Sequence, residues 1–245
     1  MNLQKAWMVA WKDFKIFRNK RNIILSTVAF PLVVAVGIPS VLWLAGASAG
    51  KIPAGVLPGV LDSFSYLFVL GAAALPTAIA SYSLAGEKMQ KSLEPLLAAP
   101  VTDEEILLGK TISAFIPPIA AIYASSVVFM ALVNLETYNA LGYAYFPNLT
   151  IGFVLLVMAP LAALFCVEFN IITSSRVTDV RTVQQIGALT TAPFGAIYLA
   201  SALGLLTLDG GSLLLLSVAL AAVDVILYYV SRATFRRDEI LTHWA

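Results

Sequence analysis

The residues best placed to do chemistry in this 245-residue chain are acidic and amide side chains inside apolar sequence. Glu168 and Asn170 lie in one long hydrophobic run, and Asp224 lies in another. A carboxylate at the centre of a membrane helix is unfavourable by roughly 3 kcal/mol on insertion scales, so such groups are expected to face protein or water. One interpretation places Glu168, Asn170 and Asp224 on a translocation pathway or in a proton relay. The other makes them neutral or hydrogen-bonded contacts between helices, for example Asp224 with Tyr228 one turn later.

Catalytic and cofactor-binding motifs are missing from the rest of the sequence. Gly109-Lys110-Thr111 ends like a phosphate-binding loop, but the required first glycine is replaced by Glu104 and the segment enters an apolar run. The single histidine, His243, and the single cysteine, Cys166, exclude a Cys/His metal cluster within one chain. We therefore expect no enzymatic activity from this chain by itself, and no cofactor or metal bound to it.

Composition places the chain in a membrane. Hydrophobic residues make up 60% of it and charged residues only 12%, about half the share in a soluble domain. The net charge of +1 argues against a nucleic-acid partner. Six apolar runs reach the ~20 residues that a helix needs to cross a bilayer. The predicted fold is one all-α integral membrane domain over residues 1–245, with spans at 23–44, 64–84, 106–135, 149–172, 183–206 and 213–230.

The distribution of basic residues predicts the orientation. Of the 15 Lys and Arg residues, 14 lie on one side of this arrangement, and Lys51 alone lies on the other. Because the basic side of a membrane protein faces the cytoplasm, both termini are expected there, in a multi-pass protein of the cell membrane.

Residues 2–20 are too charged to span and predict an amphipathic helix. Trp7, Trp11 and Phe14 share one arc at 100° per residue, whereas Lys5, Lys12, Asp13 and Lys15 share the opposite arc. A basic helix with aromatic residues on its apolar face is expected to lie flat on membrane lipid. It would serve either as a simple anchor or as a lever that reaches a cytoplasmic partner.

The loop at 86–100 is the longest predicted cytoplasmic connection. Met89, Leu93, Leu96 and Leu97 fall on one helical face. The loop closes on Thr102-Asp103-Glu104-Glu105, which predicts a capping box before the third span. An apolar stripe outside the bilayer must be covered by the protein's own helix ends, by lipid, or by a groove in another protein.

Three segments of this region together resemble a known family. Glu87, then Ser92-Leu93-Glu94-Pro95-Leu96-Leu97-Ala98-Ala99-Pro100, then Ile106-Leu107-Leu108-Gly109-Lys110 resembles the type-2 permease subunits of ATP-binding-cassette (ABC) exporters. The tail, Phe235 to Leu241, is also similar to the basic-acidic ending of that family.

The resemblance implies a permease that pairs with a second copy of itself or with a paralogous permease. It also implies two copies of an ABC ATPase subunit, which would hold the ATP and Mg. The loop would be the coupling helix, braced by the N-terminal helix. The residues that this resemblance places against the ATPase are Glu87, Lys88, Met89, Lys91, Leu93, Glu94, Leu96 and Leu97.

Two functional hypotheses of different class follow, with a third kept beside them. The first is the permease of an ATP-driven exporter of a hydrophobic or amphipathic substrate that works by alternating access, with Pro117 and Pro118 as hinge candidates. The alternative is a proton-coupled secondary transporter that uses Glu168 and Asp224. The third is a non-transporting assembly or anchoring protein. The apolar stripe of the loop favours the first, because a secondary carrier needs no external docking helix.

Overall fold

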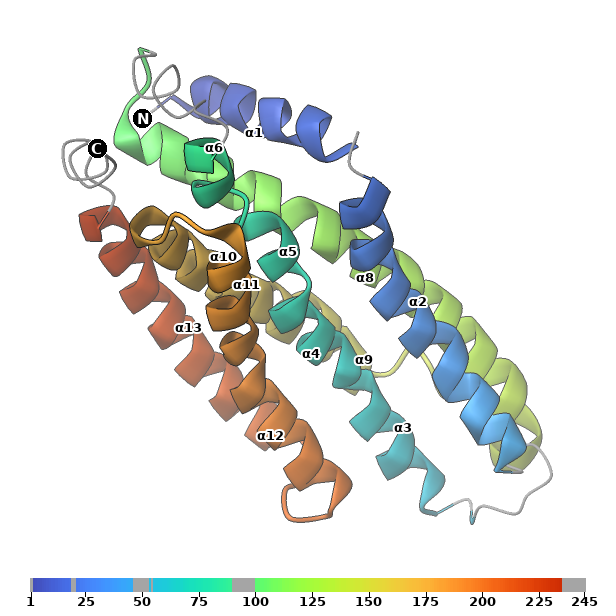
Figure 1. Ribbon diagram of the computed structural model, residues 1–245. Coiled ribbons are helices and arrows are strands. Elements are labelled where there is room, and N and C mark those ends of the chain that lie inside the picture. The colour runs from blue at the N-terminus through green and yellow to red at the C-terminus, as the bar shows by residue number, and fades with distance from the viewer. Residues whose placement is uncertain (1, 19–20, 46–52, 54, 90–99, 235–245) are drawn as a thin grey trace.

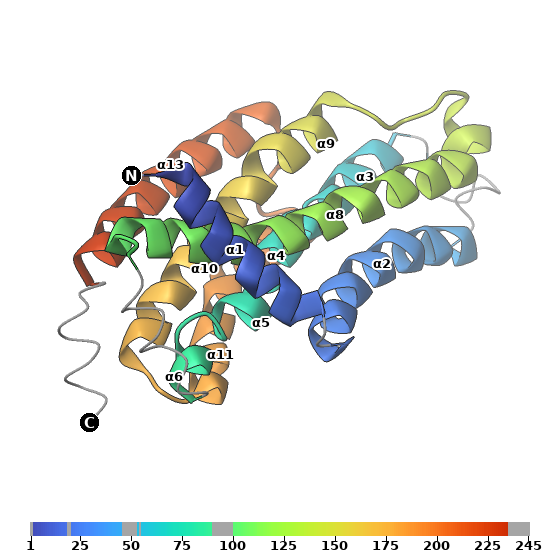
Figure 2. The ribbon, with the colours of Figure 1, turned by 90° about the horizontal axis from the view of Figure 1, so that it is seen from above.

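The computed structural model describes residues 2–18, 21–45, 53, 55–89 and 100–234, and within these ranges the regular structure is entirely helical. Figure 1 shows long helices side by side in a bundle, with α1 (Leu3–Arg18) lying across one end. Figure 2, turned by 90°, shows α1 crossing over α8 (Asp103–Leu141). The amphipathic N-terminal helix is therefore a separate layer on the bundle.

The first two passes of the bundle differ in regularity. The helix α2 (Arg21–Leu44) runs unbroken along α8, whereas the next pass is divided into short helices. Prolines stand at the starts of two of these pieces, where a missing backbone N–H does no harm. The pieces are α3 (Leu57–Ser65), α4 (Leu67–Ala74), α5 (Pro76–Ala80) and α6 (Ala85–Met89).

The helix α8 is the longest element and links the two ends of the bundle. It begins at the predicted capping box, in which the Thr102 hydroxyl accepts a hydrogen bond from the backbone N–H of Glu105. It ends where Gly142 adopts a left-handed conformation with φ of 77°, which glycine tolerates without strain. Its 39 residues continue through Pro117 and Pro118 as one helix, so a hinge there stays a prediction.

The fourth pass contains a local widening that the sequence pattern did not predict. It consists of α9 (Leu149–Phe153), a π-helical turn η1 (Val154–Met158) and α10 (Ala159–Arg176). Pro160 follows the π turn and lacks the N–H that a regular helix would use. The Tyr123 hydroxyl donates to the Leu155 carbonyl at 3.1 Å, so a carbonyl in the wide turn is satisfied by α8.

The last elements run back and forth beside α10 (Figure 1). They are α11 (Val180–Ala188), the 3₁₀ turn η2 (Leu189–Thr191), α12 (Ala192–Ala202) and α13 (Gly210–Thr234). The core between the passes is aromatic, with the Phe129 ring 5.3 Å from that of Phe68 and 5.6 Å from that of Phe146. By contrast, α13 packs mainly on α10 and leaves most of its surface exposed.

Five helical segments among the described residues are long and apolar enough to cross a membrane: Thr27–Leu44, Leu57–Met89, Asp103–Leu141, Leu149–Arg176 and Gly210–Thr234. An all-helical, multi-pass membrane protein is thus confirmed. The predicted span at 183–206 corresponds to α11, η2 and α12, which are not among these five. A sixth span and the cytoplasmic position of the termini stay predictions.

Candidate functional site

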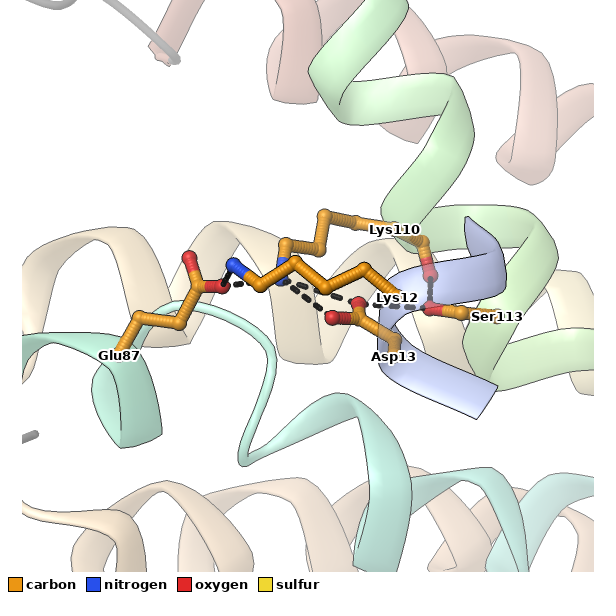
Figure 3. Close-up of polar contacts among 5 residues, drawn as sticks. All are labelled: Lys12, Asp13, Glu87, Lys110 and Ser113. Carbon is orange, nitrogen blue, oxygen red and sulfur yellow. Dashed lines mark hydrogen bonds and ion pairs between the residues drawn. The ribbon is translucent and has the colours of Figure 1, made fainter. Parts of the chain in front are cut away.

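Charged side chains from three helices meet where α1 crosses the bundle (Figure 3). The Lys110 side chain of α8 is buried, and its Nζ lies 3.0 Å from Asp13 Oδ2 of α1 and 3.0 Å from Glu87 Oε1 of α6. Ser113 donates its hydroxyl to Asp13 Oδ2 at 3.1 Å, and Lys12 Nζ lies 2.7 Å from Glu87 Oε1. We call these five residues the dock.

The burial of the dock is possible because each charge has a partner. A buried lysine without a counter-ion would be strongly unfavourable, whereas here one lysine lies between two carboxylates. The charges of the three buried residues Asp13, Glu87 and Lys110 sum to −1, and the half-exposed Lys12 supplies the remaining positive charge. The dock is therefore an electrically balanced joint between α1, α6 and α8.

Backbone contacts near the dock explain why α1 can lie so close to α8. A Cβ added to Gly109 would come within 2.6 Å of the Ala6 carbonyl oxygen, so the helices can approach this closely only with glycine there. Toward the start of both helices, the backbone N–H of Asn2 donates to Glu105 Oε1 at 2.7 Å. Lys5 Nζ donates to the Pro100 carbonyl at 2.7 Å. In the Gly109-Lys110 pair, Gly109 thus lets α1 approach closely, and Lys110 binds α1 through its ion pair with Asp13.

The neighbouring residue of α6, Lys88, makes a different internal contact. Its Nζ donates to the carbonyl oxygens of Ser174 at 3.2 Å and Ser175 at 2.6 Å. These carbonyls lie in the last turn of α10, where backbone acceptors lack helical partners and a positive charge is favourable. Lys88 therefore ties α6 to the end of α10, as Glu87 ties it to α1 and α8.

A hollow of about 340 Å³ lies beside this contact and is lined by Lys88, Met89, Thr178 and Asp179. Asp179 caps α11, and hydrogen bonds from the Thr182 side chain and backbone lower the pKa of its carboxyl below the usual range. The N-terminus of α11 is thus fixed next to the base of the predicted coupling loop.

The predicted ATPase-contacting residues divide into three groups. Glu87 and Lys88 are buried and bind other parts of this chain, while Met89 at the end of α6 is 64% exposed. The remaining residues lie outside the described part of the chain: Lys91, Leu93, Glu94, Leu96 and Leu97. The ATPase contact stays a prediction, and the geometry gives Glu87 and Lys88 a positioning role at the base of the loop.

Three aromatic residues of α1, Trp7, Trp11 and Phe14, lie on the face turned away from the dock, whereas Phe17 is buried in the core. The Trp7 and Trp11 rings are stacked 6.5 Å apart and are exposed, and the half-buried Phe14 ring lies 6.1 Å from Trp7. The sequence placed Asp13 on the arc opposite these aromatic residues but did not indicate what that arc contacts. In the structure, Asp13 of that arc points to α8, where Lys110 is its partner.

A second cluster lies between α8, α10 and α13. A partly open pocket of about 540 Å³ is lined there by Glu168 of α10 and Asp224 of α13. The two side chains are 7% and 8% exposed, and Glu168 Oε2 and both carboxylate oxygens of Asp224 have no hydrogen-bond partner. The expected bond from Asp224 to Tyr228 is therefore not formed, although Tyr228 also lines this acidic pocket.

Asn170, which the sequence groups with Glu168, is placed elsewhere. It is fully buried, its amide donates to the Cys166 carbonyl at 2.8 Å, and it lies 3.4 Å from Thr77 Oγ1. A Cβ on Gly187 would collide with Asn170, so α11 packs directly on this side chain. Asn170 joins α5, α10 and α11, and it does not line the acidic pocket.

Of the five dock residues only Glu87 was predicted as a site residue, and four were missed by sequence reasoning: Lys12, Asp13, Lys110 and Ser113. The available signal was one lysine inside an apolar run and one acid on a basic helix. The two stand 97 positions apart, so nothing local in the sequence indicates that they pair.

The fold and these clusters define a multi-pass helical membrane protein whose charged joint binds a surface helix to the bundle. Comparison with protein families matches residues 7–200 to the ABC-2 family transporter proteins. This match covers most of the chain, which therefore belongs to the ABC-2 transporter family as a membrane-spanning permease. The resemblance inferred from Glu87, the Ser92–Pro100 run and Gly109-Lys110 is confirmed. A search of curated proteins found no match.

Permeases of this family are transport components that are generally not catalytic themselves, and they associate with an ABC ATPase subunit.

Proposed function

We propose that this permease is the membrane subunit of an ABC exporter, working as a dimer with two copies of a separate ATPase subunit. ATP and Mg would be held by that subunit. The observation that carries the proposal is the dock, in which Lys110 joins the base of the loop to α1 and to α8. A loop anchored at its base by buried ion pairs is suited to transmit force rather than only to connect two spans.

The path of force follows from these contacts. A push on the loop near Leu93 would act on α6, whose Glu87 is bound to Lys110 and Lys12. It would also act through Lys88 on the last turn of α10. Closure of two ATPase subunits would thereby move α1, α8 and α10 together and switch the pathway from inward to outward facing.

A proton-coupled carrier is the second candidate function, and the unpartnered carboxylates of Glu168 and Asp224 are the observation in its favour. Membership of the ABC-2 family does not favour it. In a proton-coupled carrier, the dock at the base of the loop would also have no role in energy coupling.

Isolation of the intact complex tests the proposal. The tagged permease is purified from native membranes in mild detergent, and co-purifying proteins are identified by mass spectrometry. We expect an ATPase with Walker motifs, and its loss when Leu93 and Leu97 are both changed to Glu. The matched control changes Leu203 and Leu205 to Glu, two exposed leucines beyond the end of α12. This control should retain the ATPase.

Transport assays in proteoliposomes give the contradicting result. If transport proceeds without ATP and stops when Asp224 is changed to Asn, the exporter hypothesis is wrong and the proton-coupled carrier is favoured.

A further inference from the structure

We propose that the acidic pocket binds an amphipathic organic cation, with the carboxylates of Glu168 and Asp224 as its counter-ions. The inference deepens the proposed function by naming the chemical class of substrate, and it rests on that function for the transport of the bound molecule. Binding itself does not depend on the ATPase.

The shape of the pocket suits a small organic molecule. Its volume of about 540 Å³ lies within the roughly 300–1,000 Å³ usual for ligand sites. The lining apart from its acids is mostly aliphatic and aromatic, with leucines from α8 and α10 and with Tyr228 and Tyr229 from α13. The centroids of the two tyrosine rings lie 5.9 Å apart, with the ring planes at 69°. Such a surface favours apolar groups, and aromatic rings also attract organic cations.

The charge of the pocket specifies the sign of the ligand. Glu168 and Asp224 come from different helices, are more than nine-tenths buried, and line the same pocket. Three of their four oxygen atoms are buried without a hydrogen-bond partner. Buried polar atoms in native proteins are nearly always paired, so these oxygens are expected to meet a donor that arrives with a ligand. A cationic ammonium-type group would supply both the missing donor and the opposite charge.

The third acid in the pocket lining already has a partner within this chain, so it does not need a cationic ligand. Glu104 also lines the pocket, but its carboxylate forms an ion pair with Arg232 of α13. This pair joins α8 to α13 and leaves Glu168 and Asp224 as the unpaired acids of the lining.

An inorganic cation fits the lining less well. A divalent ion takes six or more oxygen ligands, or fewer with histidine and cysteine. Across the described residues, no group of three or more His, Cys, Asp or Glu side chains is placed to hold a metal. Two carboxylates surrounded by leucine and tyrosine instead match a ligand with one charged group and a large apolar body.

Equilibrium binding to the purified permease tests the inference. The probe is tritiated tetraphenylphosphonium, an apolar cation, and the matched probe is tetraphenylborate, which has nearly the same shape with the opposite charge. We expect saturable binding of tetraphenylphosphonium and at least tenfold weaker binding of tetraphenylborate. In Glu168→Gln and Asp224→Asn, tetraphenylphosphonium binding should weaken at least tenfold.

The matched control variant is Asp62→Asn. Asp62 lines a hollow of similar volume, about 570 Å³, between α3 and α12, but its carboxylate accepts a hydrogen bond from Asn148 at 2.9 Å. This variant should bind the cation as the unaltered permease does. Size-exclusion profiles and melting temperatures of all variants show whether each one is folded.

Two outcomes would overturn the inference. One is equal binding of the two probes, and the other is unchanged cation binding in both folded acidic-pocket variants. If a variant fails to fold, the comparison of the two probes on the unaltered permease still decides the question. If the permease binds the cation but no ATPase is recovered with it, the proposal of an ABC exporter is contradicted and the proposal of a cation-binding pocket is kept. A recovered ATPase without cation binding would contradict only the substrate class.

Discussion

The dock and the acidic pocket both bury ionisable side chains in one chain, and they treat them in opposite ways. In the dock, Asp13 and Glu87 both form ion pairs with Lys110 across three helices, and only one carboxylate oxygen, Glu87 Oε2, is buried without a hydrogen-bond partner. In the acidic pocket, Glu168 and Asp224 are both acids, and three of their four carboxylate oxygens are buried without a hydrogen-bond partner. Burial is similar in the two places, so the difference lies in the partners.

The difference teaches how to separate structural charges from functional ones. A buried ion pair holds elements together, and removing one member leaves the other without compensation. An unpaired buried acid makes no such contribution to the fold, so its presence requires another reason, and ligand binding supplies one. The two regions should therefore respond differently to neutral substitutions.

The largest expected effect is at the centre of the dock. Lys110→Met leaves Asp13 and Glu87 buried without their counter-ion, so the free energy of unfolding should fall by about 3–5 kcal/mol. Reversible unfolding by SDS in mixed micelles measures it. The control is Lys12→Met, whose half-exposed side chain should contribute less than about 1 kcal/mol. If Lys110→Met is as stable as the unaltered protein, the dock does not stabilise the fold.

The next effect concerns shape rather than charge. Gly109→Ala places a methyl group against the Ala6 carbonyl and Val9, so α1 must shift, with an expected loss of about 1–3 kcal/mol. Gly152→Ala is the matched control, because nothing lies within 4 Å of its added Cβ. The same unfolding titration applies, and similar values for the two alanine variants would contradict the close approach of α1 and α8.

A smaller effect is expected at the beginning of α8. Thr102→Ala removes the hydroxyl that accepts from the Glu105 backbone N–H, which should lower stability by about 1 kcal/mol. Thr102→Ser keeps the hydroxyl and should restore most of the loss. If serine is no better than alanine, the capping interaction does not stabilise this end of α8.

The smallest effect is expected in the acidic pocket. Glu168→Gln and Asp224→Asn break no hydrogen bond to the unpartnered oxygens, so each should change the free energy of unfolding by less than about 1 kcal/mol. The measurement is the SDS titration used for Lys110→Met. A loss as large as that of Lys110→Met would show that these acids are structural, and the contrast between the two regions would disappear.

Much of the fold was predictable from local sequence. Apolar runs and aromatic periodicity predicted the membrane helices and α1, because burial in lipid demands long uncharged helices whatever their neighbours are. The capping box at Thr102 was also predicted, since its residues are only three positions apart. The π turn at Val154–Met158 was not predicted, and neither was the division of the second pass into α3, α4, α5 and α6.

The sites were less predictable because their members are distant in sequence. Glu168 and Asp224 were singled out one by one as costly acids, but their meeting in one pocket depends on the packing of α10 against α13. Asn170 was grouped with Glu168 by proximity, yet two positions along a helix turn a side chain by about 200°. It therefore faces Thr77 and Gly187 instead.

By itself, the sequence determined an all-helical membrane protein with an amphipathic N-terminal helix, because those properties depend on composition and periodicity, and its resemblance to a family implied a permease. Only the tertiary structure decided which charges are partnered. Lys110 contacts Asp13 and Glu87 because α1 crosses α8 at Gly109, whereas Glu168 and Asp224 line one pocket and have no hydrogen-bond donor. The physical reason is that an ion pair needs atoms within about 4 Å. That distance is set by helix packing rather than by position along the chain.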